Sequence, residues 1–473
     1  MATTRRDFLR TSACALGGMA LASSIDTFGI VHALTPQAAT DYRALVCVFL
    51  NGGNDGNNMF VSLDQYDGPA GSLIEGYANV RNAAGLAIAK ASLLPVSPVS
   101  GGSYGFHPNM PEMQNLFNQG KLAVLCNNGP LVEPLTRTTY QNGTGKKPLQ
   151  LFSHSDQVGL FQTAIANNVS QTGWAGRVGD KTQGLNGAAT FPSNVSIAGV
   201  NLFLTGVDTR QLAVADSNTT LANVLQLTMS GTTSEQASRL ISFNELRPLD
   251  NNFKLVKAAS DIRSSSIQTD NALSSVNPTL ATTFPNTTLG RQLKQVALLI
   301  KACIDPIAGI NMKRQIFFTQ LGGFDTHSAE IGGQGNLLTQ VSQAISAFYA
   351  ATVELGLQDN VTTFTMSDFG RTLQPAGAGV NVVGTDHAWG NHQLIVGGSV
   401  LGHTLYGTYP TLRLGGPDDT DGGSNPRGRW IPTTSVEQYA ATLATWYGLS
   451  GADLTAVFPL IGRFATPNLG FMA

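Results

Sequence analysis

Short apolar runs recur along this chain, and polar or glycine-rich segments bound each of them. The first run, residues 44–50 (ALVCVFL), is followed at once by Asn-Gly-Gly-Asn-Asp-Gly. Four more runs of this kind lie at residues 121–126, 315–321, 361–366 and 394–398. Runs of this length between turn-forming residues are typical of strands buried on both faces. The pattern therefore predicts a buried central sheet.

Helical patterns accompany these runs, at residues 108–118, 295–304, 336–355 and 434–447. Strands that alternate with helices and end in polar loops predict an α/β fold. The middle of the chain differs, because short alternating stretches at 194–216 precede a polar helical pattern at 233–303. We expect approximately residues 190–290 to form an insertion or cap.

The N-terminus has the pattern of an export signal. Residues 4–10 (TRRDFLR) hold paired arginines, and a short apolar stretch and small residues follow. This order is typical of a removable twin-arginine signal. The apolar stretch is broken by Ser23, Ser24 and Asp26, well short of the roughly 20 residues that a membrane span needs. The alternative is a soluble amphipathic helix.

We therefore expect residues 1–39 to be the signal and its cleavage region, and residues 40–473 to be one exported domain without a permanent membrane anchor. The twin-arginine translocase would be a partner during export, and the mature chain would be periplasmic or secreted.

Composition narrows the function classes. The net charge is −2 and only 12% of residues are charged, so nothing indicates a nucleic-acid binder. Of four cysteines, Cys14 lies in the predicted signal. The odd number that remains argues against a disulfide framework.

Candidate metal ligands gather in the loops at the strand ends. They are Asp55, Asp325, Asp368 and, in a fourth loop, Asp386, His387 and His392. Ligands bind at the carboxyl ends of strands in open α/β sheets, so we expect these loops to converge. Carboxylate and imidazole groups suit a divalent cation such as Zn²⁺, Mn²⁺, Mg²⁺ or Ca²⁺.

His327 joins this set, because it caps the same strand as Asp325. The alternatives are structural. Each histidine would then be a hydrogen-bonded structural residue, Asp55 part of a tight turn, and Asp368 the N-cap of the following segment.

Two further segments hold catalytic candidates. Ser153, His154 and Ser155 precede a helical pattern, so a serine hydroxyl would lie near a helix N-terminus. Arg371 follows Asp368 by three residues and suits a phosphate or sulfate oxyanion. The alternative for Arg371 is a surface ion pair.

The motifs LNGGNDGNN, SHSDQ, GWAGR, GGFDTH, SDFGRT and GTDHAWGNH occur in this order along the chain. With them, nearly all of the mature chain resembles the DUF1501 family, exported proteins of which some are described as sulfatase-like. That family looks like a branch of the alkaline phosphatase superfamily. The resemblance implies a three-layer αβα sandwich around a mostly parallel sheet, with one or two divalent metal ions at the strand ends.

The resemblance implies ligand roles for Asp55, Asp325 and Asp368, and a late histidine supplied by His387 or His392. The chain also departs from the superfamily pattern. His327 follows Asp325 by two residues where the superfamily has four, and Phe369 replaces the ligand that normally follows the Asp368 position. No nucleophile has a secure counterpart. No C-x-P-x-R motif is present, which disfavours formylglycine-dependent sulfatase chemistry.

These observations predict an exported metal-dependent hydrolase of small phosphate or sulfate esters. The alternative is an exported non-catalytic binding or assembly protein that keeps the same fold, favoured by Phe369, the His327 spacing and the missing nucleophile.

Overall fold

A computed structural model describes residues 42–225, 234–246, 249, 253–274, 276–304 and 310–473. The predicted signal at residues 1–39 lies outside the described residues. None of the described helices is both long and apolar enough to cross a membrane.

The main sheet has strand β1 (Arg43–Asn51) near its centre, between β8 (Arg314–Gly322) and β9 (Val361–Ser367). Its order is β11-β5-β10-β9-β1-β8-β6-β7, and β12 also pairs with β5. The remaining strands are β5 (Leu122–Gly129), β6 (Asn194–Ser196), β7 (Gln211–Ala213), β10 (Asn391–Val396), β11 (Leu405–Gly407) and β12 (Thr434–Ser435). Within the described chain, every pairing in this sheet is parallel except the two made by β10.

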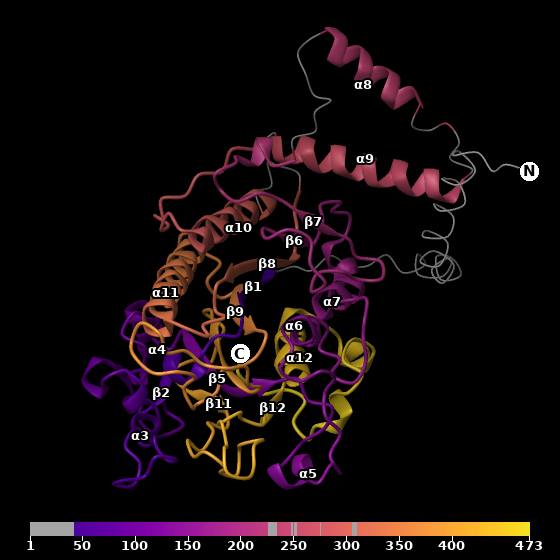
Figure 1. Cartoon of the computed structure of the whole chain (residues 1–473). Helices are drawn as coiled ribbons and strands as arrows, with labels where there is room; N and C mark the ends of the chain where they lie inside the picture. The colour runs from indigo at the N-terminus through magenta and orange to yellow at the C-terminus, as the bar shows by residue number, and fades with distance from the viewer. Residues whose placement is uncertain (1–41, 226–233, 247–248, 250–252, 275, 305–309) are drawn as a thin grey trace, which may run out of the picture.

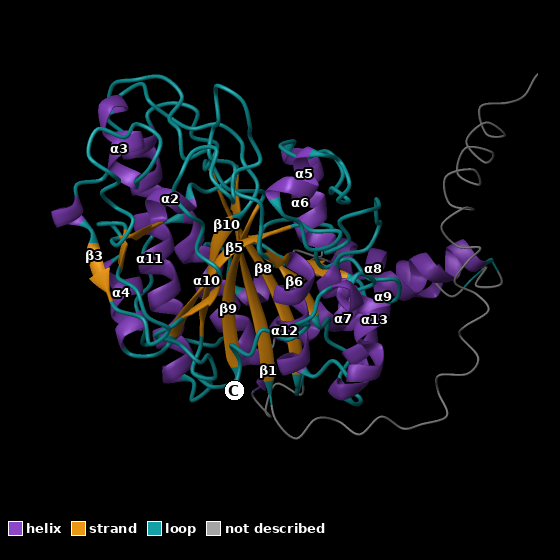
Figure 2. Cartoon of the chain, turned by 90° about the horizontal axis from the view of Figure 1, so that it is seen from below, coloured by secondary structure: helices purple, strands orange, loops and turns teal. Residues whose placement is uncertain are grey.

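Two helix layers cover the sheet (Figures 1 and 2). One layer holds α4 (Pro111–Asn118), α10 (Thr288–Ile304) and α11 (Glu330–Glu354), and the other holds α6 (His154–Thr163), α7 (Trp174–Thr182) and α12 (Val436–Tyr447). Successive strand residues point to opposite faces. Accordingly, Val46 and Val48 of β1 pack in the first apolar core, and Cys47 and Phe49 pack in the second. The predicted αβα sandwich around a mostly parallel sheet is confirmed.

All five predicted strands are present, and the four predicted helices overlap α4, α10, α11 and α12. The start of α12 has a clear local cause, because the Ser435 side chain accepts the backbone N–H of Gln438 in a capping box. The largest difference concerns β10, which begins at Asn391 and runs antiparallel to its neighbours. The loop before β10 therefore lies at the edge where the parallel strands end.

The segment predicted as an insertion or cap divides into two parts. Strands β6 and β7 extend the main sheet beside β8, so this part of the segment contributes two strands to the sheet. Helices α8 (Ser234–Leu246) and α9 (Lys254–Ser274) follow and extend beyond the sheet and its helix layers (Figure 1).

Smaller elements complete the fold. A second sheet has the order β2-β4-β3, and four short α-helices lie in the loops of the described residues, besides several 3-10 turns. The strands of this sheet are β2 (Phe60–Ser62), β3 (Leu94–Val96) and β4 (Tyr104–Phe106). The short helices are α2 (Gly56–Met59), α3 (Tyr77–Arg81), α5 (Arg137–Gln141) and α13 (Leu454–Val457). Among the described residues, Cys47, Cys126 and Cys303 are buried free thiols.

Candidate metal centre

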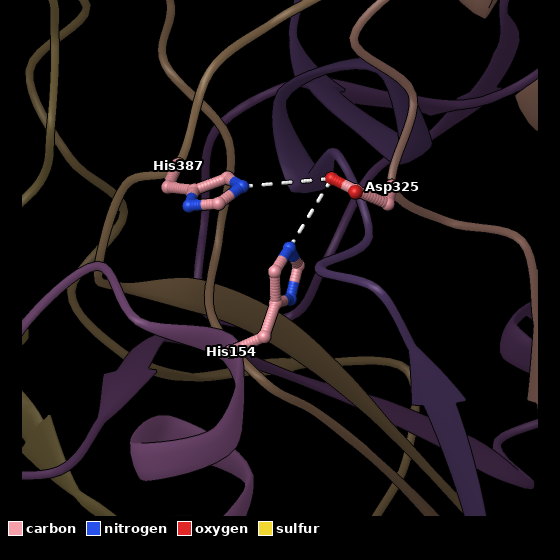
Figure 3. A group of neighbouring side chains, drawn as sticks. All are labelled: His154, Asp325 and His387. Atoms are coloured by element: carbon pink, nitrogen blue, oxygen red, sulfur yellow. Dashed lines mark ion pairs between the residues drawn. The ribbon is translucent and has the colours of Figure 1, made fainter.

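Three side chains from distant parts of the chain meet at the strand-end edge of the sheet (Figure 3). His154 is the first residue of α6, Asp325 follows β8, and His387 lies in the loop before β10. The Oδ1 atom of Asp325 lies 3.3 Å from Nε2 of His154 and 3.5 Å from Nε2 of His387. One ligand atom from each residue lies within 4.8 Å of the other two.

Each histidine is held through its other ring nitrogen. Nδ1 of His387 lies 2.8 Å from the backbone oxygen of Phe152. A carbonyl only accepts, so Nδ1 carries the proton and Nε2 keeps its lone pair. Nδ1 of His154 lies 2.8 Å from Oδ2 of Asp368. In the described part of the chain, Nε2 of His154 is buried and makes no hydrogen bond.

This donor set fits a divalent cation. Zinc bound at about 2.0–2.1 Å in a tetrahedral site has ligand atoms about 3.4 Å apart, close to the two distances from Asp325. Two histidines and one carboxylate leave a coordination position open, as catalytic zinc sites do.

Electrostatics favours the protonation states that bind metal. Burial raises the pKa of Asp325, but the hydrogen bond and the charge of Arg371 outweigh it and hold the pKa below its ordinary value. Burial lowers the pKa of His387 against the opposing effect of its bond to Phe152. Asp325 is therefore ionised and His387 neutral near pH 7.

His327 lies against two members of this group. Its Nε2 atom is 3.0 Å from Oδ1 of Asp325 and 3.0 Å from Nε2 of His387. Its Nδ1 atom is 3.3 Å from Oδ1 of Asp386, whose other oxygen pairs with Arg427. His327 is well exposed, so it lies on the solvent side of the three-residue group.

Phe369 occupies the space beside both histidine rings. Its ring centroid lies 4.6 Å from that of His154 and 4.7 Å from that of His387. The contact depends on Gly53, which has φ +81°, because a Cβ atom there would lie 2.5 Å from the Phe369 ring. Phe369 thus orients the histidines by packing and offers no ligand atom.

Residues 42–418 match the family model described as a protein of unknown function, DUF1501. The chain belongs to the DUF1501 family. Among curated proteins, no relative matches this DUF1501 chain.

Several solved structures are similar to this DUF1501 protein at low TM-score. The soluble domain of lipooligosaccharide phosphoethanolamine transferase A from Neisseria meningitidis is 8% identical, with 93% of this chain and 96% of that chain covered and a TM-score of 0.34. Ps i-CgsB with k-i-k-neocarrahexaose is 10% identical, with 90% and 77% covered and a TM-score of 0.33. The periplasmic domain of EcEptC from Escherichia coli with Zn is 8% identical, with 77% of each covered and a TM-score of 0.30. At these scores the fold assignment rests on the sheet order and helix layers of the DUF1501 chain itself.

Arg371 differs from its predicted role as an oxyanion ligand. Its side chain is fully buried, and its N–H groups donate to the backbone oxygens of Gly52, Gly53, Phe324 and Thr385 and to Asp325. The physical reason is that the loops after β1 and β8 and before β10 present their carbonyl groups to this one guanidinium. With its donors satisfied inside the protein, Arg371 holds the loops and Asp325 in place.

Asp55 and His392 are not brought into the metal group. Asp55 is buried, lies 2.5 Å from Nη1 of Arg81, and accepts the backbone N–H of Asn57 as the N-cap of α2. This is the tight-turn role given above as the alternative. His392 is buried at the start of β10, its Nδ1 accepts the backbone N–H of Asn127, and burial lowers its pKa to about 4.

The two serines beside His154 are held by a neighbouring carboxylate. Ser153 and Ser155 donate to Oδ2 of Asp156 over 2.6 Å and 3.4 Å. They lie at the start of α6, as predicted, and within the described residues their hydroxyls have no hydrogen bond to Asp325 or His387.

Sequence reasoning did not find two contributors to this site. The contact of the Phe152 carbonyl with His387 could not be predicted from the sequence, because every residue has a carbonyl group. Arg427 lies in the segment NPRGR and pairs with Asp386. The only indication of Arg427 in the sequence was that it is a charged residue in a chain with few charged residues.

Proposed function

We propose that this protein hydrolyses a small anionic ester, a phosphate or a sulfate, with one or two divalent cations bound at the His154, Asp325 and His387 group. Zn²⁺, Mn²⁺, Mg²⁺ and Ca²⁺ are the candidates. The observation that supports it most is the pair of Nε2 atoms directed at one aspartate oxygen (Figure 3). When bound, such a cation polarises an ester oxygen and lowers the pKa of water.

The chain's own residues prepare this chemistry. Arg371 and the Phe152 carbonyl hold two of the ligand side chains in place. His327, exposed and 3.0 Å from Asp325, is placed to accept or donate a proton at Nε2. Because the Ser153 and Ser155 hydroxyls donate to Asp156, water is the attacking nucleophile in this mechanism.

Export belongs to the same proposal. Residues 1–39 would direct the chain through the twin-arginine translocase to the periplasm or the medium. His154, Asp325 and His387 are far apart in sequence, so the site forms only when the sheet has assembled, and a pathway that carries folded proteins suits such a site.

A substrate panel tests the activity. Aryl phosphate, phosphodiester and aryl sulfate esters are incubated with the purified chain and each candidate cation, with and without a chelator. We expect turnover that the chelator abolishes and that H387N reduces at least 100-fold. The matched variant H403N changes a histidine outside the metal group, one that contacts Phe117 and the Ser97 carbonyl, and keeps the activity.

The second candidate is an exported binding or assembly protein without turnover. Phe369 favours it, because this apolar ring packs against both histidines where another ligand would stand. A well-folded chain that holds no metal and turns over no ester would support this candidate, whereas bound metal with no turnover would indicate a structural metal.

A further inference from the structure

We infer that Asp368 is a positioning residue that fixes the proton of His154 on Nδ1 and so leaves Nε2 free to bind the cation. The inference rests on the proposed metal site. It assigns to Asp368 a role through His154, in place of the direct ligand role that the sequence predicted.

Both oxygens of Asp368 are occupied by the protein. Oδ1 accepts the backbone N–H of Gly52 over 3.0 Å, and Oδ2 lies 2.8 Å from Nδ1 of His154. The carboxylate is fully buried directly after β9. It therefore faces the rear of the imidazole and is not part of the three-residue group.

The imidazole has little freedom to change this arrangement. Phe369 packs on its ring, and His154 is the first residue of α6, so its backbone is fixed by the helix. A carboxylate oxygen accepts the Nδ1 proton, so the lone pair remains on Nε2, 3.3 Å from Asp325. A carboxylate behind a metal-binding histidine is a recurrent support for such sites, and its loss typically costs 10- to 100-fold in metal affinity.

In one alternative arrangement, the same side chains form ion pairs with one another and bind no cation. A second proton on Nε2 would make His154 an imidazolium between the carboxylates of Asp368 and Asp325. The distance of 3.3 Å between Nε2 of His154 and Oδ1 of Asp325 permits that ion pair. Asp368 would then be an ion-pair partner with no effect on metal affinity.

The substitution D368N distinguishes the positioning role of Asp368 from the arrangement without a cation. Asparagine has the same shape, and the Gly52 N–H requires its oxygen on the Oδ1 side. Its NH₂ group then faces Nδ1 of His154 and must donate, which moves the histidine proton to Nε2 and blocks the ligand atom. We expect D368N to fold and to bind Zn²⁺ at least tenfold more weakly than the wild-type chain, as measured by titration calorimetry.

The control is D156N, which changes an aspartate of the same helix whose described partners are serines. D156N keeps the wild-type affinity if the inference is right. Equal zinc affinity in D368N and wild type would overturn the inference and leave the metal site intact. A wild-type chain that binds no zinc would instead contradict the proposed function.

A measurement on the unchanged protein keeps the inference testable if D368N fails to fold. In ¹⁵N-histidine NMR of the zinc-loaded wild type, with the His154 signals identified through H154N, we expect the proton on Nδ1. A His154 whose Nδ1 is unprotonated would overturn the inference.

Discussion

At the residue scale, Arg371 shows how a charged side chain can serve the fold of a site. It is fully buried and donates to four backbone oxygens and to Asp325. Lysine keeps the charge but has one nitrogen, so R371K leaves several buried carbonyls unpaired. We expect the free energy of unfolding to fall by about 3 kcal/mol, measured by urea denaturation.

The matched control for R371K is R427K, at a partly exposed arginine that pairs with Asp386. We expect a loss below about 1 kcal/mol there. Equal losses of unfolding free energy in R371K and R427K would contradict the structural role of Arg371. Arg371 would then again be a candidate ligand for an oxyanion.

We predict that His392 affects the stability of the protein in acid. Burial lowers its pKa to about 4, whereas an unfolded histidine titrates near 6.5. The contribution of neutral His392 to the free energy of unfolding is therefore complete above about pH 6.5. It is lost as pH falls toward 4, because the unfolded chain takes up the proton first. The expected size is on the order of 3 kcal/mol.

The test compares wild type with H392N, in which the asparagine oxygen can still accept the Asn127 N–H. Stability curves from pH 8 to 4 should diverge, with the steeper decline in wild type. His107 is retained in both proteins, and burial lowers its pKa to about 4 as well, so its effect cancels. Parallel curves would mean that His392 is not buried as a neutral group.

At the element scale, the sequence identified the strands but not their directions. An apolar run such as residues 394–398 looks the same in either direction, so nothing showed that β10 runs antiparallel and brings His387 to the site from its N-terminal side. The contact partners of the site side chains could not be predicted from the sequence either. Asp368 and Arg371 were identified as site residues by their place after a predicted strand, but both contact Gly52, more than 300 residues away in the sequence. Asp55 was identified in the same way and pairs with Arg81, 26 residues away.

Helix α9 offers a prediction about its own packing. Leu273 is fully buried, whereas Ile262, three turns earlier on the same face, is 48% exposed. We expect L273E to cost more than about 3 kcal/mol, because it buries a charge, and I262E to stay within about 0.5 kcal/mol. Thermal unfolding checks both. A large effect of I262E, or a change in oligomeric state by light scattering, would show that this face is covered in solution.

At the scale of the whole molecule, the αβα sandwich explains why residues from two separate loops and from the start of helix α6 can form one site. The carboxyl ends of parallel strands share an edge, so the loop after β8 reaches it directly. The antiparallel β10 adds the loop before it to the same edge. Sequence reasoning reached Asp325 and His387 through this rule, and it placed His154 among the candidates through its position before a helix.

The measurement that tests this account most directly is the metal content of the purified, folded chain. Wild type, D325N and the surface control D359N are loaded with each candidate cation, desalted and analysed for bound metal. We predict at least one equivalent in wild type and D359N, and a loss of one equivalent in D325N. A folded wild-type chain that retains none of these cations, or D325N that retains as much as wild type, would contradict the account.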